Sequence, residues 1–263
     1  MRLPTIYIPH GGGPWPWLTD FGGPKAMDAL RDYLVGLPAA LPQPPVAILC
    51  VTAHWEESVP TVSTAAQPGM LYDYSGFPPH TYQIRWSAPG SPSLAARVRT
   101  LLGEAGISSA EDPARGYDHG TFVPLAVSWP SADVPTVQLS LVRGLDPAEH
   151  LRIGQALRPL RDEGVLILGS GMSYHSMRGY GTEQGARDAA VFDDWLSASV
   201  QDPARRGAAL QRWSEAPSGR ASHPREEHLL PLMVVTGAAG DDRVSLPFKE
   251  TILGTRVSAV QYG

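Results

Sequence analysis

Residues 6–14 have the sequence Ile-Tyr-Ile-Pro-His-Gly-Gly-Gly-Pro, in which a short apolar segment ends in a histidine and three glycines. The apolar segment predicts a buried strand, and the glycines let the backbone approach a ligand closely. A second apolar run, residues 46–53, ends in the same way at His54. In an open α/β sheet, ligands bind outside the carboxyl ends of the strands, so His10 and His54 are predicted to converge there.

The rest of the chain alternates predicted strands and helices. Apolar runs at residues 135–142 and 165–168 predict two further central strands, and shorter strands are expected at 59–63, 82–86, 244–246 and 257–261. Helical patterns cover residues 24–37, 91–102, 146–162, 186–200, 203–215 and 229–236. We therefore predict an α/β fold: a mainly parallel central sheet flanked by helices, with a metal site in loops at the carboxyl ends of the strands.

Length and composition set limits on this fold. A chain of 263 residues is expected to form a single catalytic domain over residues 1–263. Its 26 prolines and 27 glycines predict long structured loops, which often carry function. The one cysteine, Cys50, excludes an intramolecular disulfide and is expected to be a small buried residue within its strand.

Charge and hydropathy indicate which partners to expect. The net charge is −5 and no run of Lys or Arg occurs, which argues against nucleic acid and anionic membranes as partners. The N-terminus lacks a signal-peptide pattern, and no stretch approaches 18 apolar residues. A cytoplasmic enzyme acting on a small molecule is therefore the expectation, and the sequence leaves the oligomeric state open.

Histidines provide the strongest chemical signal. Five of the eight lie in loops punctuated by glycine or proline, beside a strand end or at a helix start: His10, His54, His119, His175 and His228. Imidazole is a good ligand for iron, zinc, copper or nickel, and these spacings are too long for a zinc finger. A metal site would therefore be assembled from distant strand ends, with coordination positions open for substrate.

Other residues are expected at the edge of this site. Residues 67–79 contain Tyr72, Tyr74, Phe77 and three prolines, which indicates an ordered loop. The loop either walls an aromatic pocket or packs as ordinary surface. His80, in the same region, is expected near the substrate, and His150, in a predicted helix, is expected on the surface.

Five motifs occur in order along nearly the whole chain. They are His-Gly-Gly-Gly-Pro at 10–14, Ala-His-Trp-Glu at 53–56, Asp-His-Gly-Thr-Phe-Val-Pro-Leu at 118–125, Gly-Ser-Gly-Met-Ser-Tyr-His at 169–175 and His-Pro-Arg-Glu-Glu-His-Leu-Leu-Pro-Leu at 223–232. In this set the sequence closely resembles the class III extradiol ring-cleavage dioxygenases. The nearest branch is the DOPA 4,5-dioxygenase type.

The resemblance implies a non-haem Fe(II) enzyme that uses O2 to open the ring of a catechol. It implies metal ligation by His10, His54 and His228. Because protocatechuate-type relatives use a glutamate as the third ligand, Glu227 remains an alternative to His228, which we favour. Zn(II) is a second metal that purified protein could carry.

The resemblance also implies roles around the metal. His175 matches the general base that deprotonates the catechol, a role suited to imidazole because it titrates near pH 6.5. His119 matches a second histidine that steadies the oxygen-derived anion or protonates a leaving oxygen. Residues expected to contact the substrate are His223, Tyr72, Tyr74, Phe77 and Trp15.

Two other functions remain open at this stage. One is a zinc-dependent hydrolase on a related α/β scaffold, because histidine-rich sites bind zinc and zinc lowers the pKa of bound water. The other is a non-enzymatic relative that keeps the fold to bind a partner. The sequence does not distinguish DOPA, caffeate, a protocatechuate-like acid or another catechol as the substrate.

Overall fold

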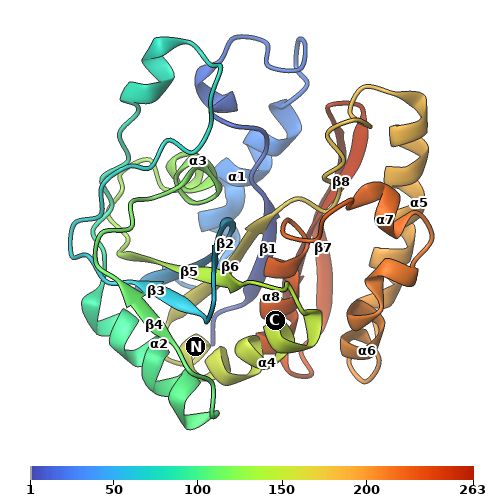
Figure 1. Ribbon diagram of the computed structural model, residues 1–263. Helices are drawn as coiled ribbons and strands as arrows, with labels where there is room; N and C mark the ends of the chain where they lie inside the picture. Colours follow the sequence, from blue (N-terminus) through green and yellow to red (C-terminus); the bar gives the residue numbers. More distant parts are fainter. Residues whose placement is uncertain (1) are drawn as a thin grey trace.

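All eight strands belong to one sheet in the computed structural model, which describes residues 2–263 (Figure 1). Their order is β4-β3-β5-β2-β6-β1-β8-β7. The strands are β1 (Thr5–Pro9), β2 (Ala47–Glu57), β3 (Thr61–Ser63), β4 (Ala110–Asp112), β5 (Thr136–Val142), β6 (Val165–Gly171), β7 (Val244–Ile252) and β8 (Thr255–Tyr262). Four of the seven pairings between these strands are parallel, including all three in the central group β5-β2-β6-β1. The predicted parallel centre is thus observed, with antiparallel pairings toward both edges.

Helices lie on both sides of this sheet. The α-helices are α1 (Asp28–Ala40), α2 (Pro92–Glu104), α3 (His119–Ser128), α4 (Pro147–Leu157), α5 (Glu183–Ser199), α6 (Arg206–Gln211), α7 (Gly219–Ser222) and α8 (Leu230–Ala239). Short 3-10 helices are η1 (Trp15–Trp17), η2 (Pro79–Gln83), η3 (Arg158–Arg161) and η4 (Trp213–Glu215). Helices α1 and α3 cover one face, and α2, α4 and α8 cover the other (Figure 1).

Two apolar cores result from the period-two alternation of the central strands. In β2, Leu49 and Val51 face the core beneath α2, α4 and α8, whereas Ile48 and Cys50 face the core beneath α1 and α3. Burying one such aliphatic side chain stabilises the fold by roughly 1.5–3 kcal/mol. This two-sided burial explains why the central strands are nearly continuous apolar runs.

Some predicted elements differ from the structure. Residues 82–86 do not form a strand. Their alternation of apolar and polar residues instead reflects the burial of Ile84 and Trp86 against α3 and its neighbours. His119, which the sequence placed in a loop, is instead the first residue of α3. That helix is buried almost all round and so shows no amphipathic period. Helix α1 starts at Asp28, four residues after the predicted start.

His150 is also placed differently from the prediction. Its side chain is fully buried, and its Nε2 accepts a hydrogen bond from the Val142 amide at 3.1 Å. Its Nδ1 donates to the Asp146 carbonyl at 2.7 Å. The surface prediction was wrong because this histidine satisfies the last amide of β5, a need that only the packed structure reveals.

Within residues 2–263, none of the helices has both the length and the apolar composition that a bilayer crossing requires.

Candidate metal centre

His10 is positioned by the backbone that follows β1. Its amide donates to the carbonyl of Gly171 in β6 at 3.1 Å, and its carbonyl accepts from the indole nitrogen of Trp15 at 2.9 Å. Gly11 has φ +80°, and a Cβ there would lie 2.3 Å from the Trp15 ring. Glycine is therefore required at this position, both for the left-handed backbone and for space.

His54 and His228 approach the same point from other elements. His54 lies inside β2, beyond its last pairing with β6 at Thr52 and within an irregular stretch of the ladder. His228 lies just before α8, and its carbonyl accepts hydrogen bonds from the Tyr7 hydroxyl at 2.7 Å and the Met172 amide at 3.1 Å. The expectation that the site residues lie in loops thus does not describe His54, which is held in a strand.

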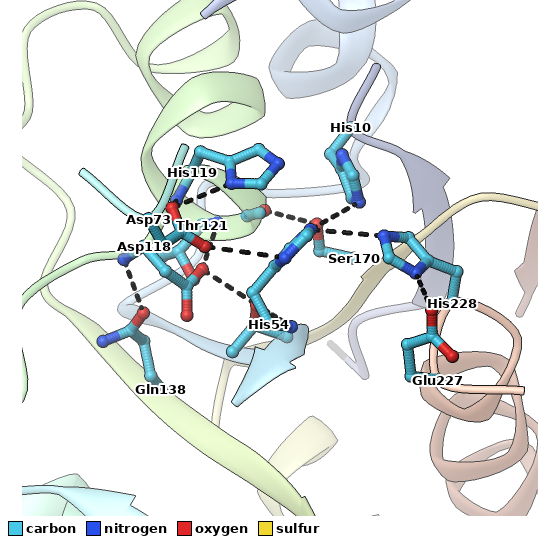
Figure 2. A network of polar contacts seen from close by, with 12 residues as sticks. His10, His54, Asp73, Asp118, His119, Thr121, Gln138, Ser170, Glu227 and His228 are labelled. Atoms are coloured by element: carbon cyan, nitrogen blue, oxygen red, sulfur yellow. Dashed lines mark hydrogen bonds and ion pairs between the residues drawn. The ribbon is translucent and has the colours of Figure 1, made fainter. Parts of the chain in front are cut away.

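The ring nitrogens of these three histidines converge (Figure 2). Nε2 of His54 lies 3.3 Å from Nε2 of His10 and 3.2 Å from Nε2 of His228. Imidazole nitrogens that bind one ion at about 2.0–2.1 Å lie about 2.9–3.4 Å apart for bond angles between 90° and 110°. The observed spacing therefore matches ligands of a single first-row metal ion.

An acceptor oxygen on the far side of each ring indicates where its proton lies. Nδ1 of His10 lies 2.7 Å from the Gly11 carbonyl, and Nδ1 of His228 lies 3.1 Å from Oε1 of Glu227. Nδ1 of His54 lies 3.5 Å from Oδ2 of Asp73. Because these oxygens only accept, each Nδ1 carries the proton and each Nε2 presents a lone pair. Three neutral imidazoles whose Nε2 atoms face one another in this way are suitable ligands for one cation.

Burial keeps these rings neutral. It lowers the pKa of His10, His54 and His228 well below the ordinary value, and the neighbouring histidines lower each pKa further. Deprotonated imidazole at neutral pH is the form that binds metal. The electrostatic environment and the geometry of these side chains therefore both favour metal binding.

His119 lies beside His54 and is held by Asp73. The two histidine rings are 3.9 Å apart between centroids. Oδ1 of Asp73 accepts from both the His119 amide, at 2.9 Å, and its Nδ1, at 2.8 Å. Burial opposes ionisation of Asp73, but the hydrogen bonds from His119 prevail and lower the pKa of this carboxyl below its ordinary value. Asp73 is thus an ionised group that contacts two histidines.

The first turn of α3 packs tightly on His54. A Cβ at Gly120 would lie 2.7 Å from Cδ2 of His54, so only glycine allows this approach. The buried side chain of Asp118 caps the helix by accepting from the Thr121 amide at 3.0 Å, and also accepts from Thr52 Oγ1 at 2.8 Å (Figure 2). These bonds join α3 to β2 and set His119 against His54.

His175 packs against His228 in the way that His119 packs against His54. Their rings are stacked, with centroids 3.4 Å apart. Oε1 of Glu227 lies 3.5 Å from Nδ1 of His175 as well as 3.1 Å from Nδ1 of His228. Burial opposes ionisation of Glu227, but the interaction with His175 lowers the pKa of this carboxyl below its ordinary value. Glu227 therefore contacts the side of His228 that faces away from His54.

The centre thus contains two similar arrangements. Asp73 bridges His54 and His119, and Glu227 bridges His228 and His175. Among residues 2–263, two groups of potential ligand atoms lie within 4.8 Å of one another: one of His10, His54 and His119, and one of His175, Glu227 and His228. Sequence reasoning missed Asp73 entirely, although its place between two tyrosines of the predicted aromatic loop was a usable signal.

The residues expected to contact substrate occupy different places. Trp15 is 1% exposed, and His223 is fully buried with its ring against Phe192 and Trp213 and Nε2 donating to the Ser173 carbonyl at 3.0 Å. Tyr72, Tyr74 and Phe77 lie in an aromatic cluster, in which Tyr74 approaches His119 with ring centroids 5.9 Å apart. Nε2 of His80 donates to the Trp17 carbonyl at 3.0 Å. Contact of these residues with a substrate stays a prediction.

A cavity of about 460 Å³ opens beside His175. Its walls come from the loop after β1, the turn before α1, the segment after β6 and the turn between β7 and β8. They are formed by Gly11, Gly12, Phe21, Gly22, Met172, His175, Met177, Tyr180, Gly181, Leu253 and Gly254. The volume is typical of a small-molecule site.

Comparison with known proteins identifies the family. Residues 25–260 match the model for the catalytic LigB subunit of aromatic ring-opening dioxygenase. The chain is 37% identical to the dioxygenase tasH of Hapsidospora irregularis, with 99% of this chain and 85% of that protein covered. It is 43% identical to a 4,5-DOPA dioxygenase extradiol of Beta vulgaris, with 90% and 87% covered.

A solved structure supports the same relationship. The crystal structure of an uncharacterised protein from Escherichia coli K12 superposes on the whole chain with a TM-score of 0.77 and 29% identity, and all of that chain is covered. The protein therefore belongs to the LigB family of aromatic ring-opening dioxygenases and is a class III extradiol enzyme of the DOPA dioxygenase-like branch.

Proposed function

We propose that this protein is a non-haem Fe(II)-dependent dioxygenase that opens the ring of a catechol with O2, and that His10, His54 and His228 hold the iron. The observation that carries the proposal is the approach of two Nε2 atoms, those of His10 and His228, to within 3.3 Å and 3.2 Å of Nε2 of His54. The Nδ1 atoms of all three histidines face acceptors, so the three rings are oriented toward an ion before it binds. Three protein ligands leave coordination positions open, as catalysis requires.

Bound Fe(II) would bring the catechol and O2 together and carry the electron transfer between them. The protein contributes orientation and proton transfer. Glu227 supports the choice of His228 as the third ligand, because its carboxylate contacts Nδ1 of His228 on the side away from His54. In this arrangement Glu227 orients the ligand and does not replace it.

His175 is proposed as the base that removes a proton from the catechol. Its Nδ1 lies beside Glu227, which leaves Nε2 free to accept a proton. Its ring stacks on His228 and lines the cavity, so a substrate in that cavity lies beside the base. An ionised Glu227 stabilises the imidazolium that forms when the proton arrives.

His119 is proposed to act on the oxygen-derived groups. Its Nδ1 donates to Asp73, so Nε2 is the nitrogen available to the site. It lies on the His54 side of the centre, whereas His175 lies on the His228 side. Two histidines on different sides allow one to accept a proton from the catechol while the other donates to a developing oxyanion.

The test is anaerobic reconstitution with Fe(II), followed by O2 and a panel of catechols, with absorbance monitored for a yellow ring-opened semialdehyde. We expect product only when Fe(II), O2 and a catechol are all present. The Zn(II)-loaded protein is the matched control and is expected to give none, because zinc has no redox chemistry. Hydrolysis of an ester or amide by the zinc form without O2 would instead establish the zinc-dependent hydrolase.

A further inference from the structure

Beyond the reaction class, the walls of the cavity beside His175 indicate which catechol is used. No Lys, Arg, Asp or Glu occurs among its lining residues in the part of the chain that the structure describes, residues 2–263. Its side chains are those of Phe21, Leu253, Met172 and Met177, together with Tyr180 and His175. The hydroxyl of Tyr180 donates to the Tyr174 carbonyl at 2.8 Å and is already engaged.

The cavity adjoins the metal centre, although His10, His54 and His228 are not among its lining residues. Gly11 and Gly12 directly follow His10, and His175 stacks on His228. A ring that reaches the three Nε2 atoms from this cavity would leave its substituent among the apolar walls. Phe21 packs on Gly12, since a Cβ at that glycine would lie 2.9 Å from the phenyl ring, so this wall is firm.

A second cavity, of about 420 Å³, shares His175 and Met177 with the first, and we call it the polar cavity because Arg178, Arg225 and Glu227 line it. It is lined by Glu227, whose carboxylate contacts the Nδ1 side of His228 and His175, so it opens behind the ligand rings. Arg225 there is paired with both oxygens of Glu56 at 2.6 Å. Arg178 is exposed, and among residues 2–263 it is the remaining basic side chain lining this cavity. The polar cavity therefore offers little to a substrate bound through the Nε2 atoms.

We propose that the apolar cavity binds the ring substituent of the substrate, and that the enzyme prefers a catechol with an uncharged, apolar substituent over the amino acid DOPA. This inference rests on the proposed function. The ammonium and carboxylate of DOPA would lose water on entering the cavity and would find no opposite charge there, which is unfavourable. An alkyl chain of the same length would gain from burial against Phe21, Met172 and Leu253.

The experiment compares 4-propylcatechol with L-DOPA, which have the same ring and the same three-carbon chain. Kinetic constants are measured with the Fe(II)-loaded enzyme, and binding of each compound is measured anaerobically by calorimetry. We expect kcat/KM and affinity to favour 4-propylcatechol at least about tenfold. Dopamine and 3-(3,4-dihydroxyphenyl)propionate carry one charge each and are expected to lie between them.

A charge variant tests the location. Met177 is 72% exposed at the mouth of the cavity, so Met177→Arg should fold and place a cation there. We expect this variant, and Leu253→Arg at a residue that lines the apolar cavity and not the polar one, to raise kcat/KM for dihydroxyphenylpropionate relative to 4-propylcatechol. Val46→Arg is the matched control, because Val46 is 63% exposed and precedes β2 at its opposite end from His54. It should leave that ratio unchanged.

The outcomes separate the two proposals. Equal or higher kcat/KM for L-DOPA in the wild-type enzyme overturns the substrate preference. If Arg178→Ala then lost the activity on L-DOPA, the carboxylate of the substrate would be assigned to the polar cavity instead. Tighter anaerobic binding of 4-propylcatechol without ring cleavage of either compound refutes the proposed reaction but supports the apolar substituent site. An unchanged substrate ratio in Leu253→Arg overturns the placement of the substituent in the apolar cavity, whatever Met177→Arg shows.

Discussion

At the residue scale, the centre depends on carboxylates that do not themselves point at the metal position. Asp73 and Glu227 each hold the Nδ1 protons of two histidines, one proposed as a ligand and one proposed for proton transfer. Such partners fix the tautomer and orientation of a ligand and raise its basicity. The negative charge of the carboxylate also stabilises the imidazolium that forms when a histidine gains a proton during the reaction.

We predict that Asp73→Asn and Glu227→Gln each weaken metal affinity by about 10- to 100-fold, because an amide is a weaker acceptor for the Nδ1 proton. Calorimetric titration of the metal-free protein measures this. Glu226→Gln is the matched control for Glu227, since Glu226 pairs with Arg220 and not with a histidine of the centre. Wild-type affinity in Glu227→Gln would show that this carboxylate does not support the ligand.

His175→Ala should separate chemistry from metal binding. The proposed ligands keep their Nε2 atoms in this variant, so most metal binding should remain, while kcat falls by about 10²- to 10⁴-fold through loss of the base. Metal content is measured by elemental analysis alongside turnover. His10→Ala is the contrasting variant and should lose the metal. Unchanged turnover in His175→Ala would remove it from the mechanism.

At the element scale, α3 must lie close to β2 for the histidines to meet. Gly120→Ala would place a methyl group 2.7 Å from the His54 ring. We expect the helix to shift, with a loss of about 1–3 kcal/mol in the free energy of unfolding and weaker metal binding. Denaturant unfolding and metal titration measure the two effects.

Gly103→Ala provides the control for that variant, because Gly103 lies in α2 and nothing is within 4 Å of its built Cβ. Alanine there should stabilise the protein by about 0.5–1 kcal/mol and leave metal affinity unchanged. Equal effects of the two substitutions would mean that the Gly120 contact does not position His54.

At the scale of the whole molecule, buried neutral histidines make the stability depend on pH. Burial lowers the pKa of His223 to about 3, against an ordinary value of 6.5. The unfolded chain therefore binds a proton on His223 below pH 6.5, whereas the folded protein does not do so until about pH 3. The free energy of unfolding should fall as the pH decreases through this window.

Replacing His223 isolates its share of this effect. Between pH 7 and pH 5 the residue should account for about 2 kcal/mol of the loss, and His223→Gln should show a correspondingly shallower dependence. Urea unfolding of the metal-free protein at the two pH values measures this difference. Parallel pH dependences for wild type and variant would contradict a neutral, buried His223.

Metal should also link the centre to global stability. Because His10, His54 and His228 come from β1, β2 and the start of α8, an ion bound to all three ties these elements together. Saturation at 100 times the dissociation constant adds about 2.7 kcal/mol to the free energy of unfolding. Thermal unfolding with and without a chelator should show a lower Tm for the metal-free form, and no change would argue against a site shared by these elements.

The amino-acid sequence alone determined the parallel centre of the sheet and the histidines that belong together. Strands buried on both faces must be continuously apolar, and polar side chains at their carboxyl ends share one edge, so both features are local in sequence. The motifs at His10, His54 and His228 carried the family, which the comparisons confirm.

Only the tertiary structure decided which side chains contact those histidines. Asp73 is 19 residues from His54 and 46 from His119 in the chain, so no local pattern could show that it bridges them. The extent of α3 and the burial of His150 likewise depend on packing, because a helix or side chain covered on all sides has no exposed face to produce a period. The apolar cavity brings together three segments distant in sequence, residues 11–22, 172–181 and 253–254, and its lack of charge is a property of their arrangement.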